Sequence, residues 1–129
     1  GHKFVRYADD CNIYVKSRRA GERVLKSITQ FLEKKLKVEV NTEKTQVGSP
    51  LSLKFLGFSL SVGRNGAYPR PHQKAKQRIK QELKRITKRN RGVSLDKILQ
   101  EIKQKMQGWI QYYSSGKMKI FLQHLDEWL

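Results

Sequence analysis

The sequence predicts an α+β chain in which antiparallel strands with one covering helix are followed by three helices. Short runs rich in β-branched and aromatic residues concentrate before Pro71. Long stretches with apolar residues three and four positions apart follow it. Pro69 and Pro71 are expected to break regular structure between the two parts. We therefore expect one domain at residues 1–70 and a helical domain at residues 71–129.

The first elements are a β-hairpin and a helix. Residues 3–8 and 11–16 alternate in strand fashion, and Asp9-Asp10 is expected to form the tight turn between them. Residues 18–37 follow with helical periodicity, and Ser17 is a candidate N-cap. The apolar stripe of this helix consists of Val24, Leu25, Ile28, Phe31, Leu32 and Leu36.

Further strands are expected before the prolines. Val38–Val40 is a short candidate strand, and residues 53–60 form a second β run in which Gly57 marks a bend or a close backbone approach. Gly63-Arg-Asn-Gly66 predicts a hairpin turn, because Asn and Gly tolerate positive φ.

Three helices are expected after Pro71. The first covers residues 73–90 and ends near Gly92, the second begins after the N-cap candidate Ser94, and the third covers roughly residues 118–129. The first carries a narrow apolar stripe, and the rest of its surface holds eight cations against one anion. We expect these cations to contact nucleic-acid phosphates, although a solvated helix face is the alternative: they are Lys74, Lys76, Arg78, Lys80, Lys84, Arg85, Lys88 and Arg89.

The net charge points to a polyanionic partner. The 129 residues include 28 Lys and Arg against 11 Asp and Glu, which gives a formal net charge of +17. Because such a charge repels itself in a compact chain, nucleic acid is the leading partner, ahead of an anionic membrane surface. No apolar run is long enough to span a membrane. One cysteine and three scattered histidines argue against a disulfide framework or a zinc site, and a reducing cytoplasm is the expected setting.

Asp9 and Asp10 stand side by side within the β-forming run FVRYADDCNIYV. A plain turn is one interpretation, since turns favour Asp. The other is a divalent-metal site at the hairpin tip, where two carboxylates can lie near one point and supply the oxygen ligands that Mg²⁺ requires. The flanking Tyr-Ala and the aromatic and β-branched neighbours favour the metal site.

Four segments stand in order along the chain: FVRYADD at Phe4–Asp10, VNTEKTQV at Val40–Val47, KFLGFSL at Lys54–Leu60 and GWIQYYSS at Gly108–Ser115. Together they resemble motifs of group II intron-encoded reverse transcriptases and related bacterial enzymes. The first is similar to the palm motif of these enzymes, and the second to the palm segment that follows it. KFLGFSL at Lys54–Leu60 resembles the primer grip. GWIQYYSS at Gly108–Ser115 resembles the Gly-Trp-x-x-Tyr-Tyr signature of the maturase region. In the family an Asp-containing segment follows this signature, and Phe121–Asp126 resembles it.

The resemblance implies a parent reverse transcriptase and maturase, an RNA-directed DNA polymerase of the bacterial cytoplasm. Residues 1–70 would be part of its palm, and residues 71–129 its thumb and the start of its maturase region. Intron RNA, an RNA/DNA template–primer and dNTPs would be its partners, without a membrane, and the sequence leaves the oligomeric state open. Two Mg²⁺ ions would serve its chemistry, with Asp9 as the direct ligand and Asp10 as the second carboxylate. The third aspartate of the family lies upstream of these motifs, so the 129 residues alone are expected to be inactive.

The resemblance also implies roles for three further places. Lys44 is either a solvated surface residue or a group near the incoming triphosphate that donates a proton to the leaving pyrophosphate. Phe55, Leu56, Gly57 and Phe58 are a buried strand, a primer grip, or both. Tyr112 lies off the apolar stripe of its helix and is a candidate for stacking on RNA.

Two other functions stay open. The chain alone could be an RNA-binding module without catalysis, and a non-intron bacterial reverse transcriptase would share the Asp pair. The Gly-Trp-x-x-Tyr-Tyr segment favours the intron enzyme.

Overall fold

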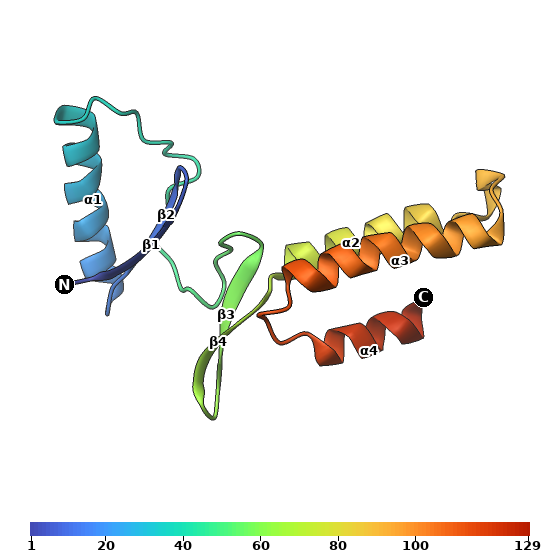
Figure 1. The fold of residues 1–129 in the computed structure, drawn as a ribbon. Helices are drawn as coiled ribbons and strands as arrows, with labels where there is room; N and C mark the ends of the chain where they lie inside the picture. Colours follow the sequence, from blue (N-terminus) through green and yellow to red (C-terminus); the bar gives the residue numbers. More distant parts are fainter. The chain divides into compact units, whose positions relative to one another are not determined.

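A computed structural model describes residues 1–129 as two compact units, Gly1–Ser49 and Pro50–Leu129. The elements are two small antiparallel sheets of two strands each and four α-helices, so the predicted α+β class is confirmed (Figure 1). None of the helices combines the length and apolar character that a membrane span requires.

The first unit begins with a hairpin of β1 (Lys3–Tyr7) and β2 (Asp10–Tyr14). Tyr7 pairs with Asp10, so the two-residue turn is Ala8-Asp9 and not the predicted Asp9-Asp10. Ala8 takes the left-handed conformation with φ 49°, and its carbonyl accepts a hydrogen bond from Arg6 Nε at 2.9 Å. A two-residue turn leaves room for only one of the two aspartates, and the other starts β2.

Helix α1 (Arg18–Lys34) follows in the same unit, with Ser17 as N-cap as predicted; the Ser17 hydroxyl accepts from Ala20 N at 3.2 Å. The helix stops three residues before the predicted end, because the chain reverses at Lys37, whose φ is 51°. Val38 N then donates to the Leu32 carbonyl at 3.0 Å. The strand predicted at Val38–Val40 is wrong, since no second strand lies beside it to form a ladder.

The second unit begins with β3 (Phe58–Gly63) and β4 (Gly66–Pro71), joined at Arg64-Asn65 as the sequence predicts. The two prolines do not break the structure, contrary to expectation, since both lie in β4. Pro69 pairs with Leu60, and Pro71 with Phe58. The Leu60 and Phe58 amides donate elsewhere, to Pro50 and Phe55, so these pairs exchange no ladder hydrogen bonds. A proline at such a position costs no hydrogen bond between the two strands, because the N–H group that it lacks would point away from the partner strand.

Three helices complete the second unit: α2 (Gln73–Ile86), α3 (Leu95–Tyr112) and α4 (Lys119–Trp128). Helix α2 ends four residues earlier than predicted, at the Thr87 cap, and a short 3-10 helix, Arg89–Arg91, carries the chain to Gly92 at φ 64°. Ser94 caps α3 as predicted. A buried cluster from α2 and α4 joins the helices, with partly buried α3 and α4 residues packed against it: its members are Ile79, Leu83 and Leu125, with Ile102, Met106, Trp109 and Phe121 around them.

Candidate nucleic-acid interface

Asp9 and Asp10 lie at the tip of the first hairpin, one in the turn and one at the start of β2. Both are exposed, and no group of three His, Cys, Asp or Glu residues gathers anywhere in the chain. Adjacent carboxylates at a strand tip offer the hard oxygen donors that Mg²⁺ takes from proteins, usually one or two at a time beside substrate phosphates. The donor set therefore fits part of a magnesium site, and further ligands would have to come from elsewhere.

Lys44 lies in a polar turn of the same unit. The Asn41 side-chain oxygen accepts from Glu43 N at 3.1 Å and from Lys44 N at 3.2 Å. Thr45 closes the turn by donating from both N and Oγ1 to the Asn41 carbonyl. The Lys44 side chain is exposed, and no hydrogen bond or ion pair joins it to the Asp pair.

The segment predicted as a primer grip forms a tight turn whose last residue, Phe58, begins β3, so the strand predicted at residues 53–60 starts only at Phe58. Phe55 and Phe58 exchange two backbone hydrogen bonds, each of 2.9 Å. The central residues both have positive φ, 53° at Leu56 and 82° at Gly57, the pattern of a type I′ hairpin turn. This conformation suits Gly57, whereas for Leu56 it costs on the order of 1–3 kcal/mol. The surrounding structure must therefore hold Leu56 in place.

Two adjacent tyrosines at the end of α3 contact this turn. The Tyr112 hydroxyl donates to the Leu56 carbonyl at 2.7 Å. The Tyr113 hydroxyl lies against Gly57, where it occupies the space that any Cβ would need. Both tyrosine rings pack on Phe58, at centroid distances of 5.8 and 4.8 Å. Burial raises the pKa of Tyr113, and neighbouring Tyr112 adds to the rise while Arg78 opposes it.

The loop after α3 fixes the same end of the helix to the second hairpin. Gly116 packs so closely on Phe58, Arg70 and Pro71 that a Cβ would meet their atoms at 3.3–3.4 Å. Lys117 N donates to the Pro69 carbonyl at 3.2 Å. Its Nζ lies 4.2 Å from the centroid of the Tyr68 ring. The segment from Tyr112 to Lys117 thus contacts both the turn and the hairpin.

The structure divides the cations of α2 and the residues after it into two groups. Lys76 and Lys80 turn toward aromatic rings of α4. Lys76 Nζ lies 5.3 Å from the centroid of the Phe121 ring, and Lys80 Nζ lies 5.6 Å from that of the Trp128 ring. Burial, with a smaller contribution from Arg70, lowers the pKa of Lys76. The other six are exposed: Lys74, Arg78, Lys84, Arg85, Lys88 and Arg89.

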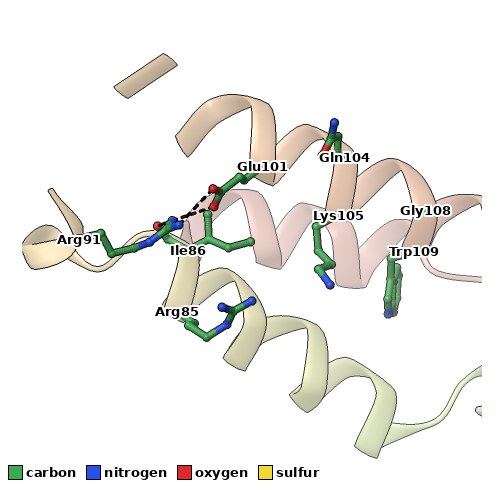
Figure 2. A pocket seen from close by; sticks show the side chains of 8 residues that line it. All are labelled: Arg85, Ile86, Arg91, Glu101, Gln104, Lys105, Gly108 and Trp109. Carbon is green, nitrogen blue, oxygen red and sulfur yellow. Dashed lines mark hydrogen bonds and ion pairs between the residues drawn. The ribbon is translucent and has the colours of Figure 1, made fainter. Parts of the chain in front are cut away.

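Glutamate side chains form ion pairs with the cations in the groove between α2 and α3. This open groove of about 610 Å³ is lined by Arg85, Lys105 and Trp109, among others (Figure 2). Glu82 lies 3.2 Å from Arg85 and 3.5 Å from Lys105. Arg91 forms two hydrogen bonds with Glu101, of 2.8 and 3.1 Å, which hold the 3-10 helix against α3. The groove therefore carries little unpaired charge, in contrast to the outer face of α2.

Tyr113 and His72 belong to this region and were not among the predicted site residues. The Tyr113 position on the apolar stripe of α3 indicates only burial, which the structure shows at 8% exposure. His72 caps α2 through its ring, and its backbone N donates to the Gly57 carbonyl at 2.8 Å. No local pattern marks either role, because both depend on the turn that lies next to them in space.

Comparison with known families assigns both parts of the chain. Residues 1–60 match the reverse transcriptase (RNA-dependent DNA polymerase) family, and residues 76–129 match the maturase-specific domain of group II introns. A search of curated proteins found no match to the chain. The first match contains the Asp pair, Lys44 and the Phe55–Phe58 turn, and the second contains Tyr112, Tyr113 and the α2 cations other than Lys74.

Proposed function

The chain belongs to the group II intron reverse transcriptase/maturase family, as its motifs predicted, and we propose that its second unit grips RNA or an RNA/DNA template–primer by the phosphate backbone. The observation that supports this proposal is the group of six exposed cations on α2 and in the residues directly after it. Five of them have no ion-pair partner: Lys74, Arg78, Lys84, Lys88 and Arg89. Cations that are free of counter-charges release condensed counterions when they meet phosphates, and this release supplies affinity.

The division of the lysines on α2 and directly after it provides a matched test. Lys84→Gln with Lys88→Gln removes two outward charges, and Lys76→Gln with Lys80→Gln removes two charges that face α4. Fluorescence anisotropy against salt concentration should give a log–log slope that is flatter by about 1.4 to 1.8 in the first variant, at roughly 0.7–0.9 per phosphate contact. The second variant should change the slope by less than about half as much.

Equal changes in the two variants would show that total charge alone sets the affinity. An unchanged salt dependence of binding in both variants would show that these lysines do not contact the nucleic acid. The loss in the outward variant should be similar for different RNA sequences, because phosphate contacts carry no base information.

For the first unit we propose a part in two-metal nucleotidyl transfer. Asp9 would be the direct ligand of Mg²⁺ and Asp10 the second carboxylate, and the bound metal would neutralise charge on the dNTP phosphates and activate the primer hydroxyl. Lys44 is proposed to stand by the triphosphate, where an exposed ammonium group can meet a phosphate oxygen. Phe55–Phe58 would lie by the primer end.

Asp9→Asn in a full-length enzyme that contains this segment should abolish cDNA synthesis and leave RNA affinity nearly intact. Parental extension rates in that variant would refute the ligand role.

The second candidate function is RNA binding without catalysis by these 129 residues alone. It is favoured by the two-carboxylate tip, because neither carboxylate belongs to a group of three His, Cys, Asp or Glu residues that could hold a metal ion. We expect no templated extension by this chain with Mg²⁺, dNTPs and primer–template. Measurable extension would refute this expectation.

A further inference from the structure

We propose that Tyr112 and Tyr113 are positioning residues for the Phe55–Phe58 turn. Their hydroxyl groups hold the strained backbone so that the turn presents two N–H donors and no free carbonyl to the nucleic acid. The inference rests on the proposed function for its ligand, and it adds a role that joins the maturase-region helix α3 to the turn.

The backbone groups of the turn are nearly all used. Phe55 and Phe58 satisfy each other, and the Gly57 carbonyl accepts from His72 N at 2.8 Å. The Leu56 carbonyl accepts from the Tyr112 hydroxyl at 2.7 Å. Only the N–H groups of Leu56 and Gly57 have no partner. A surface that offers donors alone selects an acceptor, and the acceptors along a nucleic-acid backbone are phosphate and sugar oxygens.

Tyr112 keeps the Leu56 carbonyl from competing for that site. Without the hydroxyl, a carbonyl with two open lone pairs would stand beside the two donors and repel a phosphate oxygen. The same hydrogen bond helps to hold Leu56 at a φ of 53°, which a leucine leaves readily when nothing fixes it.

Tyr113 fixes the other half of the turn by contact. Its ring is held between Trp109, at a centroid distance of 4.6 Å, and Phe58, at 4.8 Å. Its hydroxyl is thereby set against Gly57, so that the turn cannot shift toward α3 and only glycine fits. The two tyrosines act on successive residues because they are themselves adjacent at the end of a helix.

Stacking of Tyr112 on a nucleic-acid base is the competing role, since 55% of this residue is exposed. The two roles depend on different parts of the side chain. Tyr112→Phe keeps the ring and removes the hydroxyl, and Tyr112→Leu removes both. Tyr68→Phe is a matched control, because this tyrosine lies on β4 and no hydrogen bond joins its hydroxyl to the turn.

The experiment measures binding of a DNA primer–RNA template duplex to the full chain by anisotropy. Single methylphosphonate linkages, which lack the phosphate charge, are placed in turn near the primer 3′ end. In the parent chain, one linkage should weaken binding by about threefold to tenfold, the loss of one hydrogen-bonded contact. In Tyr112→Phe the same linkage should cost less than about twofold, and in Tyr68→Phe it should cost as much as in the parent.

Amide spectra supply a second readout that a merely structural role would not move. Addition of the unmodified duplex should shift the Leu56 and Gly57 N–H signals in the parent and leave them nearly unshifted in Tyr112→Phe, while the far-UV circular dichroism of the two chains stays the same. Should Tyr112→Phe unfold, Tyr113→Phe is carried through the same two measurements with the same expectation.

An equal methylphosphonate penalty in the parent and in Tyr112→Phe would overturn the proposal. So would full sensitivity in Tyr112→Phe combined with weak binding of Tyr112→Leu, which would indicate stacking. Salt-dependent binding that no single linkage affects would overturn this inference and leave the proposed phosphate grip intact. An absence of salt-dependent binding would overturn both.

Discussion

The two compact units bury very different amounts of their own apolar surface. In Gly1–Ser49 the only buried residue is Gly21, and Phe4 and Tyr7 of the first hairpin are 68% and 63% exposed. In Pro50–Leu129 the helices share a core in which Leu83 is fully buried. A lone two-stranded hairpin is at best marginally stable, whereas helices that share a core support one another. The proposed metal ligands therefore lie on the weakly supported unit, and the proposed grip lies on the well-supported one.

This difference separates two kinds of functional residue. The carboxylates at the hairpin tip are exposed and make no structural contacts that fix them, so ligands would have to order them. The tyrosines and the Phe55–Phe58 turn are fixed by the packing of the second unit before any ligand binds. Mutations should therefore affect stability strongly in the second unit and weakly in the first.

The largest effect is expected at the helical core. Leu83→Ala should lower the free energy of unfolding by about 2–5 kcal/mol, through lost transfer energy and the cavity left behind. The control on α1 is Phe31→Ala, at a residue that is 53% exposed, with an expected loss of less than about 1.5 kcal/mol. Urea unfolding followed by circular dichroism measures both, and equal losses would contradict the proposed difference between the units.

The next effect tests the contact between Tyr113 and the turn. Gly57 and Gly66 both have positive φ, 82° and 102°, but only Gly57 is crowded by the Tyr113 hydroxyl. Ala at either position suffers backbone strain, so Gly57→Ala should destabilise the chain by about 1–3 kcal/mol more than Gly66→Ala. Thermal unfolding of the two variants measures the difference. In a Tyr113→Phe background the difference should shrink, and a constant difference would argue against the contact.

A smaller effect is expected at the ion pair between Arg91 and Glu101, which holds the 3-10 helix against α3. Hydrogen bonding to Arg91 lowers the pKa of Glu101, and the nearby positive charges add to this. A carboxyl with a lowered pKa in the folded state stabilises above its ordinary pKa and loses that contribution as the pH falls through the lower value. The parent should therefore be more stable than Glu101→Gln at neutral pH. The advantage should begin to fall near the ordinary glutamate pKa of about 4.3 and vanish only below the lowered value of the folded state, and thermal unfolding across pH would reveal it.

The smallest effect is expected at the metal tip. Asp9→Asn should change the free energy of unfolding by no more than about 0.5 kcal/mol, because the side chain is exposed and has no ion pair. Calorimetry of the parent and the variant measures this. A loss as large as that of Leu83→Ala would mean that Asp9 supports the fold and would weaken its assignment as a ligand.

Local patterns predicted much of the fold. Ser17 and Ser94 cap the helices that their sequences indicate, and the Gly63–Gly66 turn joins two strands. The predictions failed where a partner was needed: Val38–Val40 has the composition of a strand but no neighbour, and Pro69 is tolerated because of its register with Leu60. Strand formation depends on a ladder, which a single segment cannot reveal.

The sequence by itself determined the α+β class, the cationic surface and the family, because periodicity, charge and short motifs are properties of neighbouring residues. The tertiary structure alone decided which lysines of α2 face α4 aromatic rings and which face outward. It also decided that Leu56 adopts a left-handed conformation beneath the Tyr112 hydroxyl, 56 residues further along the chain. A leucine prefers other backbone angles on its own, so its conformation follows from contacts that only the folded chain brings together.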